Sequence, residues 1–165
     1  MDAMNVDVLS RRKVSAMESR DDTCLVSIWS LVALATGFYE EAPINFEGWK
    51  DTIRLDFDDV TLRDNVPILN PLMQAGNDHG FVTVPFDSTH ARPLLDFIER
   101  HKGSPFIIHC DAGISRSVAV GTFMAAFHGY DVKFHQTNSD EYRNVHVFNV
   151  LRRTAFGEDV GLIPA

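Results

Sequence analysis

A cysteine and an arginine six positions apart, Cys110 and Arg116, are the side chains in this sequence best suited to chemistry. They lie between two apolar runs, residues 105–109 and 118–127. The first run is typical of a buried strand and the second of a buried helix. A loop between a strand and a helix N-terminus points backbone N–H groups inward at the positive end of the helix dipole. The sequence therefore predicts an anion-binding loop that contains a nucleophile.

The residue types within this loop suit a bound phosphate. A helix N-terminus and nearby cations favour the thiolate form of a cysteine, which is its nucleophilic form. The guanidinium fork of Arg116 matches two phosphate oxygens, and Gly113 allows a close backbone approach. We expect the phosphate-binding loop to comprise Asp111, Ala112, Gly113, Ile114, Ser115 and Arg116.

Three neighbours are expected to support the loop. His109 would orient it through a ring N–H. Ser115 and Ser117 can cap the helix that follows, and Ser117 could also donate a hydrogen bond to the Cys110 sulfur. Such a bond would help the thiolate to leave again after it has reacted.

These residues resemble the signature of the cysteine-dependent protein tyrosine phosphatases. His109-Cys110-x-x-Gly113-x-x-Arg116-Ser117 matches every fixed position of that signature, and HCDAGISRS is most similar to compact dual-specificity-type members of bacterial and phage kind. The resemblance implies an α/β fold with a central, mostly parallel sheet flanked by helices on both faces. It also implies a hydrolase that forms a phosphocysteine intermediate on Cys110, without a metal or other cofactor.

The resemblance further implies a general acid upstream of the nucleophile, because a carboxylic acid must protonate the leaving oxygen. Residues 54–60 look like the strand-then-Asp passage of small bacterial members. On that match Asp59 is the expected acid and Asp58 the alternative. Asp59 lies farther from Cys110 than in compact members, so residues 61–85 would be an insertion that could wall the site. Asp87 is a further alternative, although it also suits the cap of the next helix.

Phosphorylated proteins or peptides are the expected substrates, with phosphotyrosine first and phosphoserine or phosphothreonine if the pocket is shallow. Asp111 would repel a polyanion. One rival function is a phosphatase-like module that binds phosphorylated partners with little or no turnover. Another is a sulfur- or arsenate-handling enzyme, which would need a second cysteine near Cys110. Cys24 is the remaining cysteine, and it is expected in the core.

Length and composition predict one catalytic domain over residues 1–165. A net charge of −8 argues against nucleic-acid binding and against an anionic membrane surface. No apolar run is long enough to span a bilayer, and a catalytic cysteine implies a reducing compartment, so a cytoplasmic protein is expected. The seven histidines lack metal-ligand spacing. The oligomeric state is left open.

Local patterns predict the elements that surround the loop. The basic triplet 11–13 is expected on a solvated face. Strands are expected at 6–9 (an edge strand), 23–29, 52–57 and 105–109, and helices at 10–17, 66–73, 88–103, 117–128 and 140–156, with a polar connection at 130–139.

Overall fold

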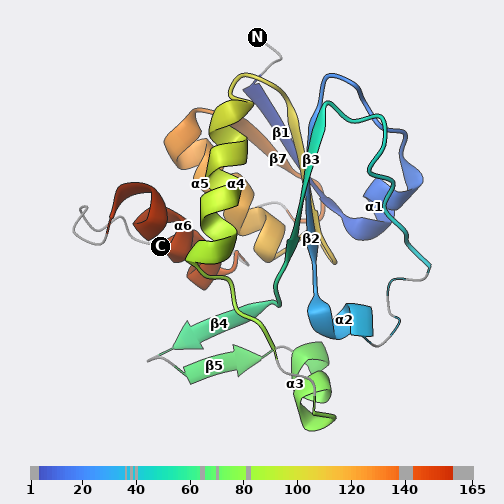
Figure 1. Ribbon diagram of the computed structural model, residues 1–165, viewed down its shortest axis with the longest axis vertical. Coiled ribbons are helices and arrows are strands. Elements are labelled where there is room, and N and C mark those ends of the chain that lie inside the picture. The colour runs from blue at the N-terminus through green and yellow to red at the C-terminus, as the bar shows by residue number, and fades with distance from the viewer. Residues whose placement is uncertain are drawn as a thin grey trace.

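A sheet of five parallel strands forms the centre of the protein (Figure 1). The computed structural model describes residues 4–35, 37, 39, 41–63, 66–69, 71–80, 83–137 and 143–157, without the side chains of residues 62, 63, 66–68 and 72. The elements are β1 (Asn5–Ser10), α1 (Arg11–Ala16), β2 (Cys24–Trp29), α2 (Leu31–Ala35), β3 (Asp51–Asp56), β4 (Val60–Arg63), β5 (Val66–Leu69), α3 (Pro71–Asp78), α4 (Ser88–Arg100), β6 (Phe106–Cys110), α5 (Arg116–His128), β7 (Asp131–Phe134) and α6 (Val145–Phe156).

The strands run in the order β3-β2-β6-β1-β7, and each neighbouring pair is parallel. Parallel strands have both faces covered, which explains why every residue of β2 and β6 is buried. Helices α4, α5 and α6 cover one face and α1 covers the other (Figure 1). The described chain is therefore an α/β protein with flanking helices.

Alternate strand residues supply the two cores. The larger core joins one face of the sheet to α4, α5 and α6 and includes Val8, Val26, Ile108, Phe97, Phe123 and Leu151. The smaller core, under α1, contains Leu9, Val14, Leu25 and Ile107. Neighbours such as Val8 and Leu9, or Ile107 and Ile108, thus point to opposite faces, as the period of a strand requires.

A second, two-stranded sheet lies outside the main one. Strands β4 and β5 pair antiparallel, from Val60 opposite Leu69 to Arg63 opposite Val66, and α3 follows them (Figure 1). Together these elements span most of the segment 61–85 that the sequence analysis interprets as an insertion. Pro71 begins α3, where the missing N–H of proline costs nothing.

Three expectations about the elements are wrong. Strand β1 lies between β6 and β7 and is not an edge strand, because it pairs in parallel with a neighbour on each side. The supposed polar connection 130–139 contains β7, a four-residue edge strand with alternating exposure. Residues 66–69 form a strand and not the first part of a helix, because pairing with β4 outweighs a short apolar run.

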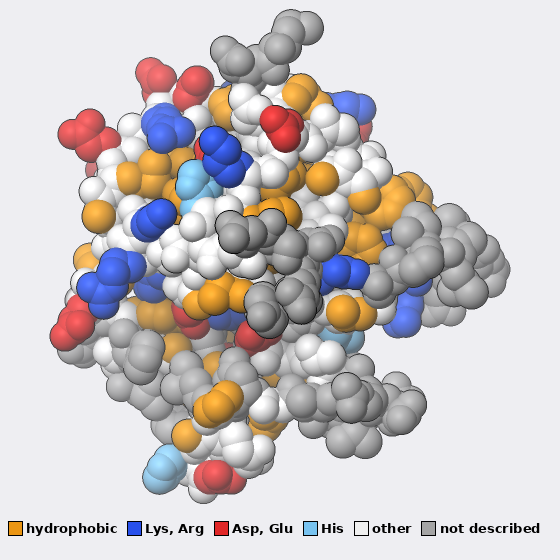
Figure 2. All heavy atoms as spheres, turned by 180° about the vertical axis from the view of Figure 1, so that it is seen from behind, with side chains coloured by type: hydrophobic (Ala, Val, Ile, Leu, Met, Phe, Trp, Pro, Cys, Tyr) orange, Lys and Arg blue, Asp and Glu red, His pale blue; other side chains and the backbone are white. Residues whose placement is uncertain are grey.

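On the face shown in Figure 2, the described charged side chains are not sorted by sign. Figure 2 shows acidic and basic side chains interspersed over the face opposite to that of Figure 1. Among the described residues, no helix is both long and apolar enough to cross a bilayer.

The carboxyl ends of β1, β2, β3 and β6 meet at one edge of the sheet, because the strands are parallel and neighbouring. The residues that follow these ends are Arg11, Ser30, Phe57 and Asp111. Crevices at this edge are the usual position of ligand sites in such sheets. The candidate site lies there.

Candidate active site

The loop between β6 and α5 is seated directly on the end of β1. Gly113 has a φ of 74°, and a Cβ there would lie 2.7 Å from the backbone carbon and oxygen of Leu9. On the other side, the Arg11 N–H donates to the Asp111 carbonyl oxygen at 3.1 Å. Two separate features therefore require glycine at position 113: the positive φ and the close approach to the backbone of β1. The loop is fixed by the core of the sheet.

Cys110 is the last residue of β6, and its sulfur lies 3.0 Å from the Ser117 hydroxyl in the first turn of α5. Ser115 occupies the N-cap position of α5, but its side chain makes no capping hydrogen bond. Neither serine therefore caps the helix as the sequence suggested. The N-terminal N–H groups of α5 thus stay clear of serine hydroxyls at the loop.

His109 lies buried beneath the loop as a neutral imidazole. Burial lowers its pKa to about 4. Its Nδ1 donates to the Cys110 carbonyl oxygen (3.0 Å), so its Nε2 accepts from the Ser27 hydroxyl (2.6 Å). The Trp29 indole N–H in turn donates to the Ser27 oxygen at 2.8 Å. This chain of hydrogen bonds fixes the ring and, through it, the carbonyl next to the nucleophile.

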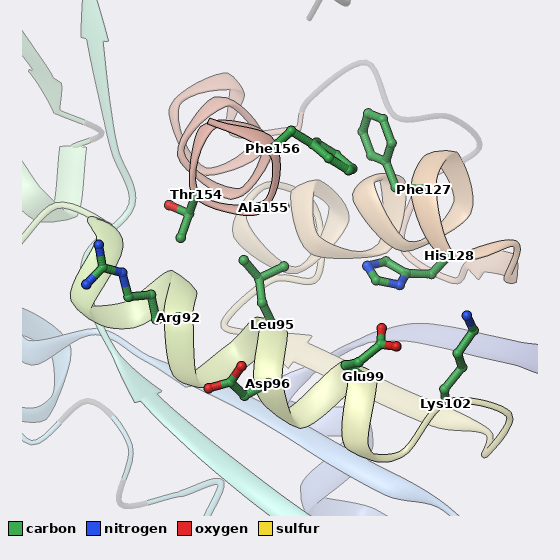
Figure 3. A pocket seen from close by; sticks show the side chains of 10 residues that line it. All are labelled: Arg92, Leu95, Asp96, Glu99, Lys102, Phe127, His128, Thr154, Ala155 and Phe156. Atoms are coloured by element: carbon green, nitrogen blue, oxygen red, sulfur yellow. The ribbon is translucent and has the colours of Figure 1, made fainter. Parts of the chain in front are cut away.

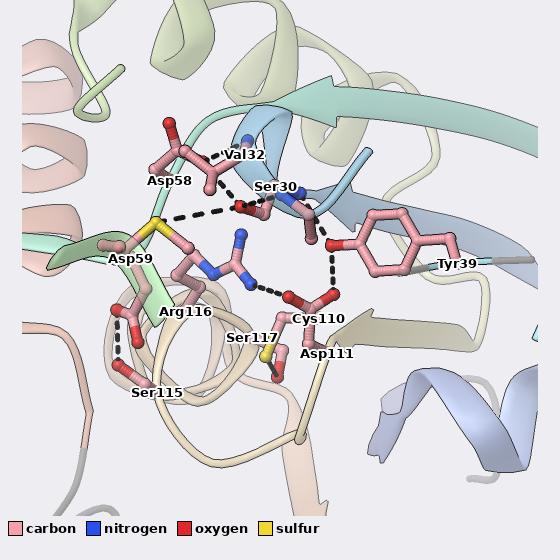
Figure 4. Close-up of polar contacts among 12 residues, drawn as sticks. Ser30, Val32, Tyr39, Asp58, Asp59, Cys110, Asp111, Ser115, Arg116 and Ser117 are labelled. Carbon is pink, nitrogen blue, oxygen red and sulfur yellow. Dashed lines mark hydrogen bonds and ion pairs between the residues drawn. The ribbon is translucent and has the colours of Figure 1, made fainter. Parts of the chain in front are cut away.

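Arg116 is buried with its guanidinium held from two sides (Figure 4). Its Nη1 donates to the Phe57 carbonyl oxygen at 2.8 Å, and its Nη2 donates to Asp111 at 3.0 Å. Its Nε has no hydrogen-bond partner among the described residues. Burial alone would lower the pKa of Arg116, but the charges of Cys110, Asp111 and Asp59 outweigh burial and raise that pKa above its ordinary value. The guanidinium is thus a fixed cation whose Nε–H is buried and unpaired within the described part of the chain.

Asp111 links Arg116 to a tyrosine that the sequence analysis missed. The Tyr39 hydroxyl donates a short hydrogen bond to one Asp111 oxygen while Arg116 donates to the other. Burial, and then the Asp111 charge, raise the pKa of Tyr39 above its ordinary value. Tyr39 therefore stays protonated and holds the carboxylate that orients Arg116.

Arg11 is buried, contrary to the expected solvated face of residues 11–13. Its guanidinium carbon lies 3.8 Å from the centre of the Trp29 ring and 3.7 Å from that of Tyr39. None of its three guanidinium nitrogens has a hydrogen-bond partner in the described part of the chain. Burial lowers its pKa, opposed by Tyr39 and Asp111. Cation–π contacts with the two rings take the place of hydrogen bonds at this position.

Asp59, in the turn between β3 and β4, reaches the loop from the other side of the site. Its Oδ1 accepts hydrogen bonds from the Ser115 hydroxyl at 2.9 Å and from the Asn144 amide at 2.8 Å. The same Asn144 caps α6, since its Oδ1 accepts from the Val147 N–H. These bonds leave Oδ2 of Asp59 as the oxygen that can carry a proton. The family resemblance puts Asn144 where members can carry a residue that supports the phosphate loop, although only a surface or structural role was expected for it.

The two alternative acids lie elsewhere. Asp58 is fully buried and accepts from the Ser30 hydroxyl (2.6 Å), the Val84 N–H (2.7 Å) and the Val32 N–H (3.3 Å). Asp87 caps α4 on the surface, and its hydrogen bonds from Thr89 lower its pKa. Neither carboxylate lines the cavity at Cys110. Through these hydrogen bonds Asp58 holds the segment next to Asp59 against residues 30–32 and 84.

A cavity of about 270 Å³ brings these groups together. It is lined by Asp59, Met73, Cys110, Asp111, Ala112, Ile114, Ser115 and Arg116. Of the expected catalytic and loop residues, only Gly113 is not on this lining, because it faces β1. Met73, from α3, was not expected. The cavity thus combines a nucleophile, a cation and a carboxyl group.

Cys24 lies too far along the sheet to bond to Cys110. It is fully buried, as expected, and burial raises its pKa to about 11. Cys24 pairs with Phe106, four residues before Cys110 on the same strand. At about 3.3 Å per residue, the two Cα atoms are separated by more than about 10 Å, beyond the reach of a disulfide. The sulfur- or arsenate-handling alternative therefore lacks its second thiol.

A larger cavity, of about 550 Å³, lies between α4, α5 and α6 (Figure 3). Its charged side chains include Arg92, Asp96, Glu99 and Lys102, which have both signs, and Phe127 and Phe156 line its apolar part. It contains neither cysteine. Size alone therefore does not identify the reactive site in this protein, and the chemistry favours the smaller cavity.

Comparison of the chain with protein-family models, with curated proteins and with solved structures finds no match in any of the three. The function must accordingly be argued from the geometry of the site.

Proposed function

We propose that this chain hydrolyses phosphomonoesters as a metal-independent, cysteine-dependent protein-tyrosine or dual-specificity phosphatase. One observation carries the proposal: Cys110, Arg116 and Asp59 line the same small cavity at the N-terminus of α5. The match of residues 109–117 to the phosphatase signature agrees with it, and so we also propose the dual-specificity-like version of the α/β fold.

In the first step the Cys110 thiolate attacks phosphorus in line with the leaving oxygen. The S–P bond forms as the P–O bond breaks, and the proton on Asp59 Oδ2 passes to the leaving oxygen. The Arg116 guanidinium and the N–H groups of the loop bind the phosphoryl oxygens, where negative charge develops.

In the second step water attacks the phosphocysteine. Asp59, now ionised, takes a proton from that water, the S–P bond breaks, and inorganic phosphate leaves. The Ser117 hydroxyl, 3.0 Å from the sulfur, stabilises the departing thiolate by a hydrogen bond. The same carboxyl group thus acts first as acid and then as base.

The proposed substrates are phosphorylated proteins or peptides. The Asp111 carboxylate on the cavity lining disfavours ligands that carry several phosphates, because like charges repel within a confined site. A catalytic thiolate survives in a reducing compartment, so the proposed location is the cytoplasm.

The test is hydrolysis of p-nitrophenyl phosphate in the presence of a metal chelator. We expect turnover by the wild type and a loss of at least about 10³-fold in Cys110→Ser. Asp59→Ala should flatten the basic limb of the pH–rate profile, because that limb reports the acid. Asp87→Ala, at the surface cap of α4, is the matched control and should keep the basic limb of that profile.

Two results would contradict the proposal. Turnover that survives in Cys110→Ser would remove the cysteine mechanism. A wild type that binds inorganic phosphate but hydrolyses nothing would instead be the phosphate-binding module considered above.

A further inference from the structure

Helix α3 supplies part of the lining of the phosphate cavity, although it lies outside the main sheet. Met73 is 1% exposed overall, and it lines the cavity together with two apolar loop residues, Ala112 and Ile114. The groups that suit the phosphate, Cys110 and Arg116, belong to the loop. The apolar part of the lining is therefore available to whatever the phosphate is attached to.

The position of Met73 is fixed by an unusually close helix contact. Gly76, three residues later on the same face of α3, packs against Val32 of α2. A Cβ on Gly76 would lie 2.3 Å from a Val32 methyl carbon, so only glycine permits this spacing. The Ser30 hydroxyl, which donates to Asp58, also lies 3.8 Å from the Met73 sulfur. Met73 is thus placed by the same residues that organise the acid loop.

Resting on the proposed phosphatase function, we infer that Met73 is a specificity-determining residue that selects aryl over alkyl phosphomonoesters. A methionine sulfur makes favourable contacts with aromatic rings, and the apolar lining gains more from a flat ring than from a short alkyl chain. The substrate class is therefore the phosphorylated side chain of tyrosine, in preference to that of serine or threonine.

The experiment compares kcat/KM for phenyl phosphate with kcat/KM for a phosphoserine peptide. In Met73→Ala we expect the aryl-to-alkyl ratio to fall about tenfold, mainly through the KM of the aryl substrate. Gly76→Ala should lower the ratio in the same direction, because it displaces α3 while leaving Met73 in the chain. Gln74→Ala, on the exposed side of α3, is the matched control and should leave the ratio unchanged.

A second readout does not depend on turnover. Calorimetry measures the binding of phenylphosphonate and methylphosphonate to Cys110→Ser, with and without the Met73 substitution. If Met73→Ala does not fold, Met73→Gln carries the test, because it keeps the length of the side chain and makes the lining polar.

The outcomes separate this inference from the proposed function. An unchanged ratio and unchanged phosphonate preference in the Met73 variants would overturn the role of Met73 and leave the phosphatase intact. A preference for phenylphosphonate that is lost in the Met73 variants would support the role of Met73. If the wild type also hydrolyses no phosphomonoester, the role of Met73 would stand and the proposed hydrolase would be overturned.

Discussion

The two halves of the site are built in different ways. The loop half, from β6 to α5, is embedded in the sheet: Gly113 contacts the backbone of β1, and His109 is bonded through Ser27 to β2. The acid half, residues 57–80, lies outside the sheet as a hairpin and a short helix. It is attached through Asp58 and through Asn144.

The difference separates two tasks. The nucleophile and the anion site need fixed geometry, and the core of the sheet provides it. The carboxyl group and the apolar lining act on the leaving group of the proposed substrate. They belong to elements outside the sheet, which can change without disturbing it. Substitutions should therefore destabilise the protein most in the loop half and alter selectivity most in the acid half.

Paired glycine substitutions are the strongest test of this contrast. Gly113→Ala places a Cβ against β1 and forces a positive φ, so we expect a loss of about 4 kcal/mol in unfolding free energy and of most phosphate binding. Gly80→Ala also has a positive φ but meets nothing within 4 Å, so the loss should be about 1 kcal/mol. Urea denaturation measures both, and equal losses would remove the contrast.

The pH dependence of stability should come from the loop half through His109. Its pKa of about 4 in the folded protein lies below the ordinary 6.5, so the unfolded chain binds the proton more readily. Stability is therefore complete above about pH 6.5 and falls by about 3 kcal/mol as the pH approaches 4. Urea denaturation across this range should show that slope in the wild type and a reduced slope in His109→Gln. Parallel slopes would contradict the assignment.

The neighbouring aspartates should separate stability from catalysis. Asp58→Asn turns one hydrogen-bond acceptor into a donor beside two N–H groups and the Ser30 hydroxyl, and should cost about 2 kcal/mol of unfolding free energy. Asp59→Asn keeps an acceptor for Ser115 and Asn144 and should cost less than about 1 kcal/mol. Thermal denaturation and the pH–rate profile, measured on both variants, should rank them in opposite orders. The same order in both measurements would contradict the division of roles.

The loop half could be predicted from the sequence because its signals are local. The strand expected at 105–109 is observed at Phe106–Cys110, and the helix expected at 117–128 is observed at Arg116–His128, each within one residue. The turn glycine and the apolar run of the helix can each be recognised within a short stretch of sequence. A local pattern therefore sufficed to predict the strand, the loop and the helix around Cys110.

The acid half and its contacts depend on pairings that no local pattern contains. Strand β5 carries the same short apolar run that a helix would, and only its pairing with β4 decides between them. Tyr39 and Asp111 are far apart in the sequence, so no local pattern predicts their contact. The last helix, expected over residues 140–156, begins at Val145 with Asn144 as its N-cap; residues 138–142 lie outside the described part of the chain.

The central position of β1 has a consequence for biosynthesis. Val6 pairs with Phe106 on one side and with Val132 on the other, so both partners of the first strand are translated late. Until then a nascent chain holds β1, with Val6, Val8 and Leu9 uncovered and both strand edges unpaired, which is a template for unwanted association. The cavity, whose loop rests on the end of β1, can form only after β6 and α5 have been synthesised. Folding on the ribosome should therefore leave this site unformed until residues 106–128, which hold β6, the loop and α5, have emerged.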